Sequence, residues 1–136
     1  MNDEEKTTLC RVRFARAEEC LHTAEENILL GDYRAAANRT YYAIFHAMRS
    51  VLALDEIDMS KHSAIIAAFR KAYLKTSILD RRFSGLITDA FEIRNESDYD
   101  DFYIVVKADV EEEIADTKEF LSAIKQHLKC RGIVLD

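Results

Sequence analysis

The side chains best suited to chemistry share one face of a helix expected over residues 38–54. At about 100° per residue, this face is polar and carries Asn38, Arg39, Tyr42, His46, Arg49 and Ser50. The opposite sector is apolar and predicts burial. A face that needed only to be hydrated would more often carry Glu and Lys, whereas Arg, Tyr and His bind phosphate, stack on bases or form interfaces. The pattern indicates either a self-association and packing surface or a ligand site.

Arg94 is a second candidate, because it stands where a hydrophobic residue is expected. A helix that turns Phe83, Ile87 and Ala90 inward places Arg94 about 20° from Phe83, within the apolar sector. An unpaired buried guanidinium costs several kcal/mol, so Arg94 needs a carboxylate, carbonyl or phosphate partner. Two interpretations follow: an ion pair that holds the helix end, or an anion-binding arginine at a cleft.

His62 is the third candidate, in the first turn of a helix that Ser60 is expected to cap. The positive end of the helix dipole disfavours its protonation, so the imidazole is either a neutral proton acceptor or simply a hydrated side chain beside a cap. The 4 histidines, His22, His46, His62 and His127, fall on different helices without HxxxH or HExxH spacing. We therefore predict no metal site and no cofactor.

The elements that must position these residues are helices. The 136-residue chain contains no Pro and 3 Gly, and 49% of its residues are hydrophobic, which is typical of unbroken helices. We predict an all-α, antiparallel four- to five-helix bundle forming a single domain over 1–136. Its core spans about 5–128, and the tail 130–136 either frays or docks through Ile133, Val134 and Leu135.

Helix boundaries are predicted from capping residues and apolar spacing. The first helix is expected over about 4–30, followed by a turn at Gly31 and a second helix that Asp32 caps. Three later helices are expected to begin at Ser60, at Ser77 with Asp80, and at Asp109 with Glu112, with a break in the helical pattern over 95–103. The 4-3-4-3-4 apolar spacing of the first and last helices predicts that they pack as long neighbours.

Charge and cysteine usage narrow the classes of partner. A net charge of −6 argues against binding of nucleic acid through a general basic field, although it leaves room for a local basic pocket. Cys10, Cys20 and Cys130 are odd in number and lack CxxC spacing, which favours a reducing compartment over a disulfide or zinc framework. Charged residues interrupt every apolar run, so we expect a cytoplasmic protein without a signal peptide or membrane span.

Three blocks of sequence carry a family resemblance. AANRTYYAIFHAMRSVLAL, KHSAIIAAF and IRNESDY occur in this order, and together they resemble the HEPN family, in its subgroup of small stand-alone UPF0332-like proteins. The resemblance covers about residues 5–128. It implies a helical bundle that commonly forms a homodimer, is often encoded beside a minimal nucleotidyltransferase as a toxin–antitoxin pair, and cleaves or binds RNA.

The same resemblance implies a chemistry for Arg94. Ribonuclease members carry an Arg, a polar residue and, after a spacer, a His; the RNA 2′-OH is the nucleophile, the His moves a proton and the Arg stabilises the phosphate charge without a metal. Arg94 and Asn95 match the first two positions, but Tyr99 stands where the His is expected. Tyrosine, with a pKa of about 10, is a poor general base at neutral pH. Either His62 or His46 approaches Arg94 in space, or the cleft only binds.

Three functions therefore stay open. The leading one is an RNA- or nucleotide-binding dimer that uses Arg39, Tyr42, His46, Arg49 and Arg94, together with a nucleotidyltransferase partner. The second is a metal-independent endoribonuclease whose catalytic residues are Arg94, Asn95, His62 and Tyr99. The third is a purely structural helical adaptor in which Arg94 is an ion-paired core residue.

Overall fold

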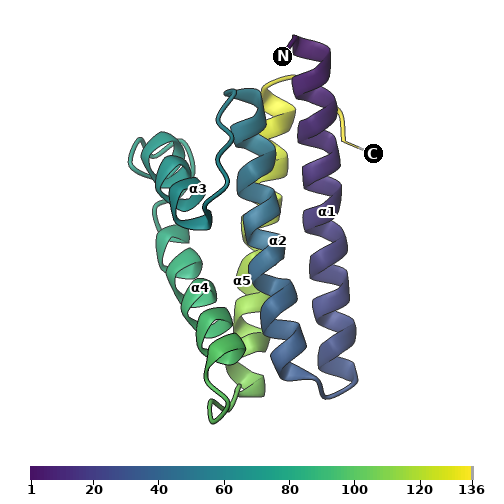
Figure 1. Ribbon diagram of the computed structural model, residues 1–136. Helices are drawn as coiled ribbons and strands as arrows, with labels where there is room; N and C mark the ends of the chain where they lie inside the picture. The colour runs from purple at the N-terminus through teal and green to yellow at the C-terminus, as the bar shows by residue number, and fades with distance from the viewer. Residues whose placement is uncertain (136) are drawn as a thin grey trace.

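The computed structural model describes residues 1–135, and over these residues it is helical and contains no strand. The five α-helices are α1 (Asp3–Leu29), α2 (Tyr33–Leu54), α3 (His62–Phe69), α4 (Phe83–Tyr99) and α5 (Lys107–Cys130), and a π-helical turn over Arg70–Leu74 follows α3. Helices α1, α2 and α5 run the length of the bundle, while α3 and α4 pack on one side (Figure 1). The predicted all-α bundle is confirmed.

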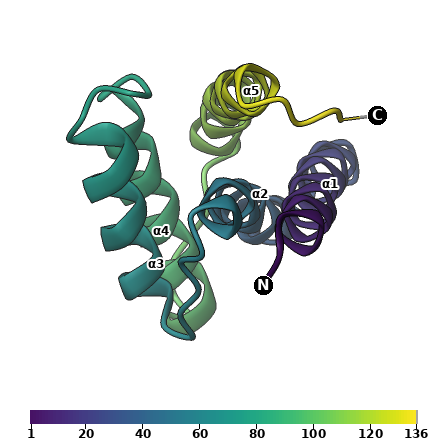
Figure 2. The same cartoon turned by 90° about the horizontal axis from the view of Figure 1, so that it is seen from above.

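Helix α2 occupies the centre of the bundle. Seen from above, it lies between α1, α5 and the pair formed by α3 and α4 (Figure 2). Its alanines at 36, 43 and 47 are fully buried, so a neighbouring helix can approach closely, and Met48, Val51 and Leu52 fill the core behind them. A helix packed on several sides cannot keep a hydrated polar face, so the polar face predicted over 38–54 is partly buried.

The turn between α1 and α2 forms as predicted. Gly31 has φ +77°, which a glycine adopts without strain, and the Asp32 side chain accepts a hydrogen bond from the Ala35 amide at 3.1 Å. Helices α1 and α5 are neighbours, joined on their exposed side by the Glu25–Lys118 ion pair at 3.2 Å. Both helices place their predicted apolar seams in the core.

This cap provides a stability prediction. We expect Asp32→Ala to lower the free energy of unfolding by about 1 kcal/mol, because the Ala35 amide loses its acceptor. Asp32→Asn, which keeps a side-chain oxygen, serves as the matched control and should stay near the parent. Urea unfolding measures both, and equal losses in the two variants would contradict the role of Asp32 as a cap.

The predicted helix starts after residue 54 are wrong. Ser77 has φ +61° and lies in a turn that buries Leu79, so α4 begins at Phe83 instead. Helix α3 begins after Lys61 rather than Ser60, and α5 begins at Lys107, which places Asp109 and Glu112 inside its first turns. Burial of Leu79 and Phe83 accompanies the later start of α4, whereas α3 and α5 start within a few residues of the predicted caps.

The stretch 95–103 was predicted to break the helical pattern, but α4 continues through Tyr99. The added turn is held by the buried Ser97, whose hydroxyl donates to the Arg94 carbonyl at 3.0 Å, and by Arg34 of α2, which donates to the Ser97 carbonyl. This extension places Asp98 one turn after Arg94. It is the local feature on which the geometry of the site depends.

The tail docks rather than frays. After Cys130 the chain turns at Gly132. Ile133 and Leu135 are partly buried and pack against the core. The side chain of Val134 is exposed, but its carbonyl accepts a hydrogen bond from Arg11 Nε at 2.7 Å. The last residue of the tail, Asp136, lies outside the described residues. No helix within 1–135 combines the length and apolarity needed to cross a membrane.

Candidate functional site

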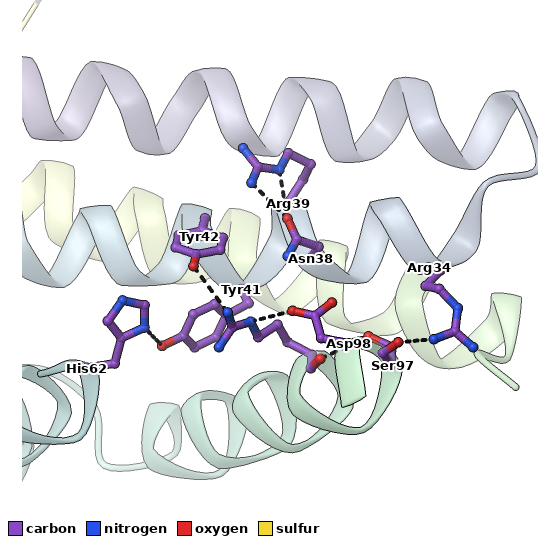
Figure 3. A network of polar contacts seen from close by, with 9 residues as sticks. Arg34, Asn38, Arg39, Tyr41, Tyr42, His62, Ser97 and Asp98 are labelled. Atoms are coloured by element: carbon purple, nitrogen blue, oxygen red, sulfur yellow. Dashed lines mark hydrogen bonds and ion pairs between the residues drawn. The ribbon is translucent and has the colours of Figure 1, made fainter. Parts of the chain in front are cut away.

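The ring of Tyr42 is the point at which most of the predicted site residues meet. Arg39 and Arg94 place their guanidinium carbons 5.2 and 5.5 Å from its centroid. The imidazole rings of His46 and His62 lie 6.0 and 5.8 Å from it, centroid to centroid. Arg39 and His46 share the polar face of α2 with Tyr42, whereas His62 comes from the first turn of α3 and Arg94 from α4. Figure 3 shows Arg39 and Tyr42 on α2 and His62 on α3.

Arg94 is held mainly by aromatic rings. Its side chain is 16% exposed, its Nη2 donates to the Tyr42 hydroxyl at 3.3 Å, and its Cζ lies 5.2 Å from the Tyr41 centroid. Its Nε lies 2.9 Å from Asp98 Oδ2, an ion pair in which the N–H does not point along the line to the oxygen. Within residues 1–135, Nη1 has no hydrogen-bond partner. Arg94 thus forms the expected intrahelical ion pair, and one of its donors is not satisfied by the described residues.

His62 is the candidate proton acceptor that lies nearest Arg94. Its Nδ1 is 2.8 Å from the Tyr41 hydroxyl, and its ring stacks on Phe45 with centroids 4.1 Å apart. Burial, with the charges of Arg94 and Arg49, lowers the pKa of His62. Burial also raises the pKa of Tyr41 to about 12, so its hydroxyl stays protonated. The direction of this pKa shift is the one expected from the sequence, but its causes are burial and arginine charges rather than the helix dipole.

Arg13 and Arg16 of α1 also belong to this region, and the sequence analysis did not find them. Arg13 is 6% exposed and donates to the Arg49 carbonyl at 3.3 Å and to Asp58 at 3.2 Å, while Arg49 donates to the other oxygen of Asp58 at 3.1 Å. We define the arginine cluster as Arg13, Arg16, Arg39, Arg49 and Arg94. Within residues 1–135, its ion pairs are limited to Asp58 and Asp98.

His46 lies close enough to four members of the arginine cluster for their charges to act on it. Burial, together with the charges of Arg16, Arg49, Arg39 and Arg13, lowers the pKa of His46 to about 4. Its Nδ1 is buried without a hydrogen-bond partner. The charges that keep His46 neutral are those that would attract an anion to this face.

The depressed His46 pKa can be tested directly. We expect the His46 imidazole to titrate near pH 4 in an NMR pH series, and Arg49→Gln to raise that midpoint by removing one repelling charge. Between pH 6.5 and 4, His46 is protonated in the unfolded chain but not in the folded chain. Acidification over this range should therefore destabilise the fold. A His46 midpoint near 6.5 would contradict the burial described above.

The structure does not bring Asn95 and Tyr99 to the other predicted residues. Asn95 is exposed, and Tyr99 is 76% exposed. Five residues beyond Arg94 on α4, Tyr99 lies about 140° around the helix axis from it. Asp98 instead faces Arg94, at the i+4 spacing that favours a carboxylate–guanidinium pair. That spacing was visible in the sequence once the helix was known to continue past residue 95.

Comparison with known proteins agrees with this architecture. The model of the family described as HEPN domain matches residues 10–127. A "UPF0332 protein" of Thermotoga maritima is 32% identical over 128 residues, covering 93% of this chain and 94% of its own length. Two Methanocaldococcus jannaschii proteins named "Putative toxin" are 29% and 31% identical, covering 88% and 83% of this chain and 81% and 84% of their own lengths. The chain belongs to the HEPN domain family and is similar to its UPF0332 proteins.

Proposed function

We propose that the face around Tyr42 binds the phosphate groups of RNA or of a nucleotide. The observation that carries this proposal is that Arg39 and Arg94, from different helices, both lie over the Tyr42 ring. Two guanidinium groups on one ring can contact the same phosphate or adjacent ones, and an aromatic ring beside them can stack on a base. Arg49 and His46 extend this surface along α2.

The charge balance supports a local site in an acidic protein. The five residues of the arginine cluster are balanced by ion pairs to Asp58 and Asp98 alone within residues 1–135, whereas the whole chain carries a net charge of −6. Binding of this kind depends on a few close phosphate contacts and weakens as salt competes for them.

Filter retention of labelled single-stranded RNA in EDTA, measured across a series of salt concentrations, tests the proposal. We expect the logarithm of the association constant obtained from retention to fall linearly with the logarithm of the salt concentration, with a slope of about −0.7 for each phosphate neutralised. Arg49→Gln should lower retention and flatten the slope, while Arg81→Gln, a remote arginine that donates to the Lys75 carbonyl, should change neither. Competition by a nucleoside monophosphate would assign the site to nucleotides. No retention at low salt would contradict the proposal.

Ribonuclease activity is a second candidate function, favoured by the position of His62. The His62 ring packs against the Tyr42 ring, and the Arg94 guanidinium lies over the same ring. A proton acceptor and a phosphate-binding group therefore both contact Tyr42. In such a reaction the 2′-oxygen attacks phosphorus, its proton passes to the imidazole, and the 5′-oxygen leaves and takes up a proton. The product would carry a 2′,3′-cyclic phosphate.

Incubation of labelled RNA with the protein in EDTA tests this activity. We expect cleavage that leaves cyclic phosphate ends, with a rate that falls 100-fold or more, roughly, in His62→Ala. The matched control is His22→Ala, because His22 is exposed on α1 and pairs with Glu26. Cleavage at an unchanged rate in His62→Ala would rule out His62 as the proton acceptor, and its absence in the parent would leave binding alone.

We also propose that the protein acts as a homodimer and as the toxin half of a pair with a nucleotidyltransferase. The names of the Methanocaldococcus relatives support the toxin assignment. Exposed apolar side chains gather near the ends of α1 and α4, at Leu29, Leu30, Tyr99, Phe102 and Ile104, and support an interface there. Light scattering of the protein alone and with the partner would test both assemblies, and a monomer in each case would contradict them.

A further inference from the structure

A pocket of about 540 Å³ lies between α4 and α5, away from the arginine cluster. Its lining includes six carboxylates: Asp89 and Glu92 from α4, and Asp109, Glu112, Glu113 and Asp116 from α5. Within residues 1–135 none of the six forms an ion pair with a Lys or Arg. Carboxylates gathered in this way repel one another, and they favour a bound cation.

The burial of Glu113 without a partner is not explained by a contribution to the stability of the fold. It is 6% exposed, and both of its carboxylate oxygens are buried without a hydrogen-bond partner. Burial, reinforced by the charges of Asp89, Asp109, Asp116 and Glu112, raises the pKa of Glu113 to about 8. A buried carboxyl group without a partner destabilises a protein, so its place beside a pocket points to a partner from outside the chain.

The one basic residue of the lining is already engaged. Arg82 lies 2.6 Å from Glu119 and 3.3 Å from Asp80, and its Cζ stacks 4.5 Å from the Phe83 centroid. Neither Glu119 nor Asp80 lines the pocket. The six carboxylates are therefore left to a ligand.

We propose that this pocket binds an organic cation whose ammonium or guanidinium group donates hydrogen bonds to Glu113. The other five carboxylates balance the remaining positive charge, and Phe83, Leu86 and Ile93 offer apolar walls against which methylene groups pack. A free polyamine and a lysine or arginine side chain of another protein both have this chemistry. The site shares no lining residue with the arginine cluster, so it stands independently of phosphate binding.

Isothermal titration calorimetry at pH 7 tests the proposal with two probes of equal charge, spermidine and an N-acetylated trilysine amide. Because the folded protein holds Glu113 protonated at this pH, we expect binding of at least one probe to release that proton. Glu113→Gln should weaken that binding about tenfold or more, because the variant cannot form the charge-assisted hydrogen bond. Glu112→Gln removes an exposed carboxylate of the same pocket and should weaken binding less than about threefold. Glu4→Gln removes an exposed carboxylate of α1 outside the pocket and should leave the affinity unchanged.

The outcomes separate the sources of the cation and the alternatives. Tighter binding of spermidine assigns the pocket to a polyamine, and tighter binding of the peptide assigns it to a protein side chain. Thermal unfolding checks that Glu113→Gln is folded, and Glu113→Leu provides a second variant without the carboxylate. Equal affinity in the parent and these variants, no binding of either probe, or binding of Mg²⁺ alone would overturn the proposal.

Discussion

Replacement of Arg94 by alanine is expected to weaken RNA binding about 10- to 100-fold. A charge-assisted hydrogen bond contributes about 1.5–3 kcal/mol, and Arg94 is the member of the arginine cluster whose guanidinium is held chiefly by aromatic rings. Filter retention of the parent and the variant at one salt concentration measures the change. Arg94→Lys keeps the charge without the planar fork and should fall between the two.

Arg81→Ala is the control for a general loss of positive charge, since Arg81 lies away from the site and should bind RNA like the parent. Urea unfolding of Arg94→Ala separates binding from folding, because the change also removes the ion pair to Asp98. Unchanged RNA binding together with a lower free energy of unfolding would favour the structural adaptor. In that case a double-mutant cycle between Arg94 and Asp98 should show coupling in stability alone.

Replacement of Glu113 by leucine is expected to stabilise the protein strongly at alkaline pH. The folded-state pKa of Glu113 is about 8, whereas its ordinary value is 4.5. Between these pH values the folded chain keeps a proton that the unfolded chain releases. The free energy of unfolding therefore falls as pH rises from 4.5 to 8, and it falls no further through Glu113 above pH 8. A shift of this size corresponds to on the order of 5 kcal/mol, which the variant should recover.

Urea unfolding at pH 5 and pH 9 measures this effect. The stability gained by Glu113→Leu should be several kcal/mol larger at pH 9 than at pH 5, because the parent carboxyl group is still protonated when folded at the lower pH. Glu4→Leu, which removes an exposed carboxylate of α1 and leaves Glu113 in place, should keep the parent's fall in stability between these pH values. An equal gain at both pH values would mean that Glu113 is not kept protonated by burial.

The sequence was sufficient to predict the bundle, because the apolar spacing of α1, α2 and α5 and the cap at Asp32 agree with the packing. It did not predict the starts of α4 and α5. Ser77 and Asp109 are good capping residues in isolation, but the burial of Leu79 and Phe83 decides where α4 starts. A helical reading of 95–99 needed tertiary contacts from Arg34, which lies more than sixty positions earlier.

The sequence relates candidate residues that share one helix, but it does not relate residues on elements that meet only in the folded chain. Arg39, Tyr42 and His46 are related by helical spacing, so the sequence places them together. Arg13 could not be assigned to the site from the sequence, because its partners Arg49 and Asp58 lie on other elements that meet α1 only in the folded chain. The same holds for Arg16, whose charge acts on His46 of α2. The partnership of Glu113 with the α4 carboxylates joins elements that are distant in sequence, and only the folded chain brings them to one pocket.

Phosphate groups are expected to bind between Arg39 and Arg94 over Tyr42. NMR of the arginine Nε–H groups during titration with a short oligoribonucleotide tests this binding, each signal being assigned through its lysine variant. We predict that the Arg39 and Arg94 signals shift in a saturable manner while that of Arg82, which pairs with Glu119, stays in place. Shifts confined to arginines outside the cluster, or no shift at saturating RNA, would contradict the claim.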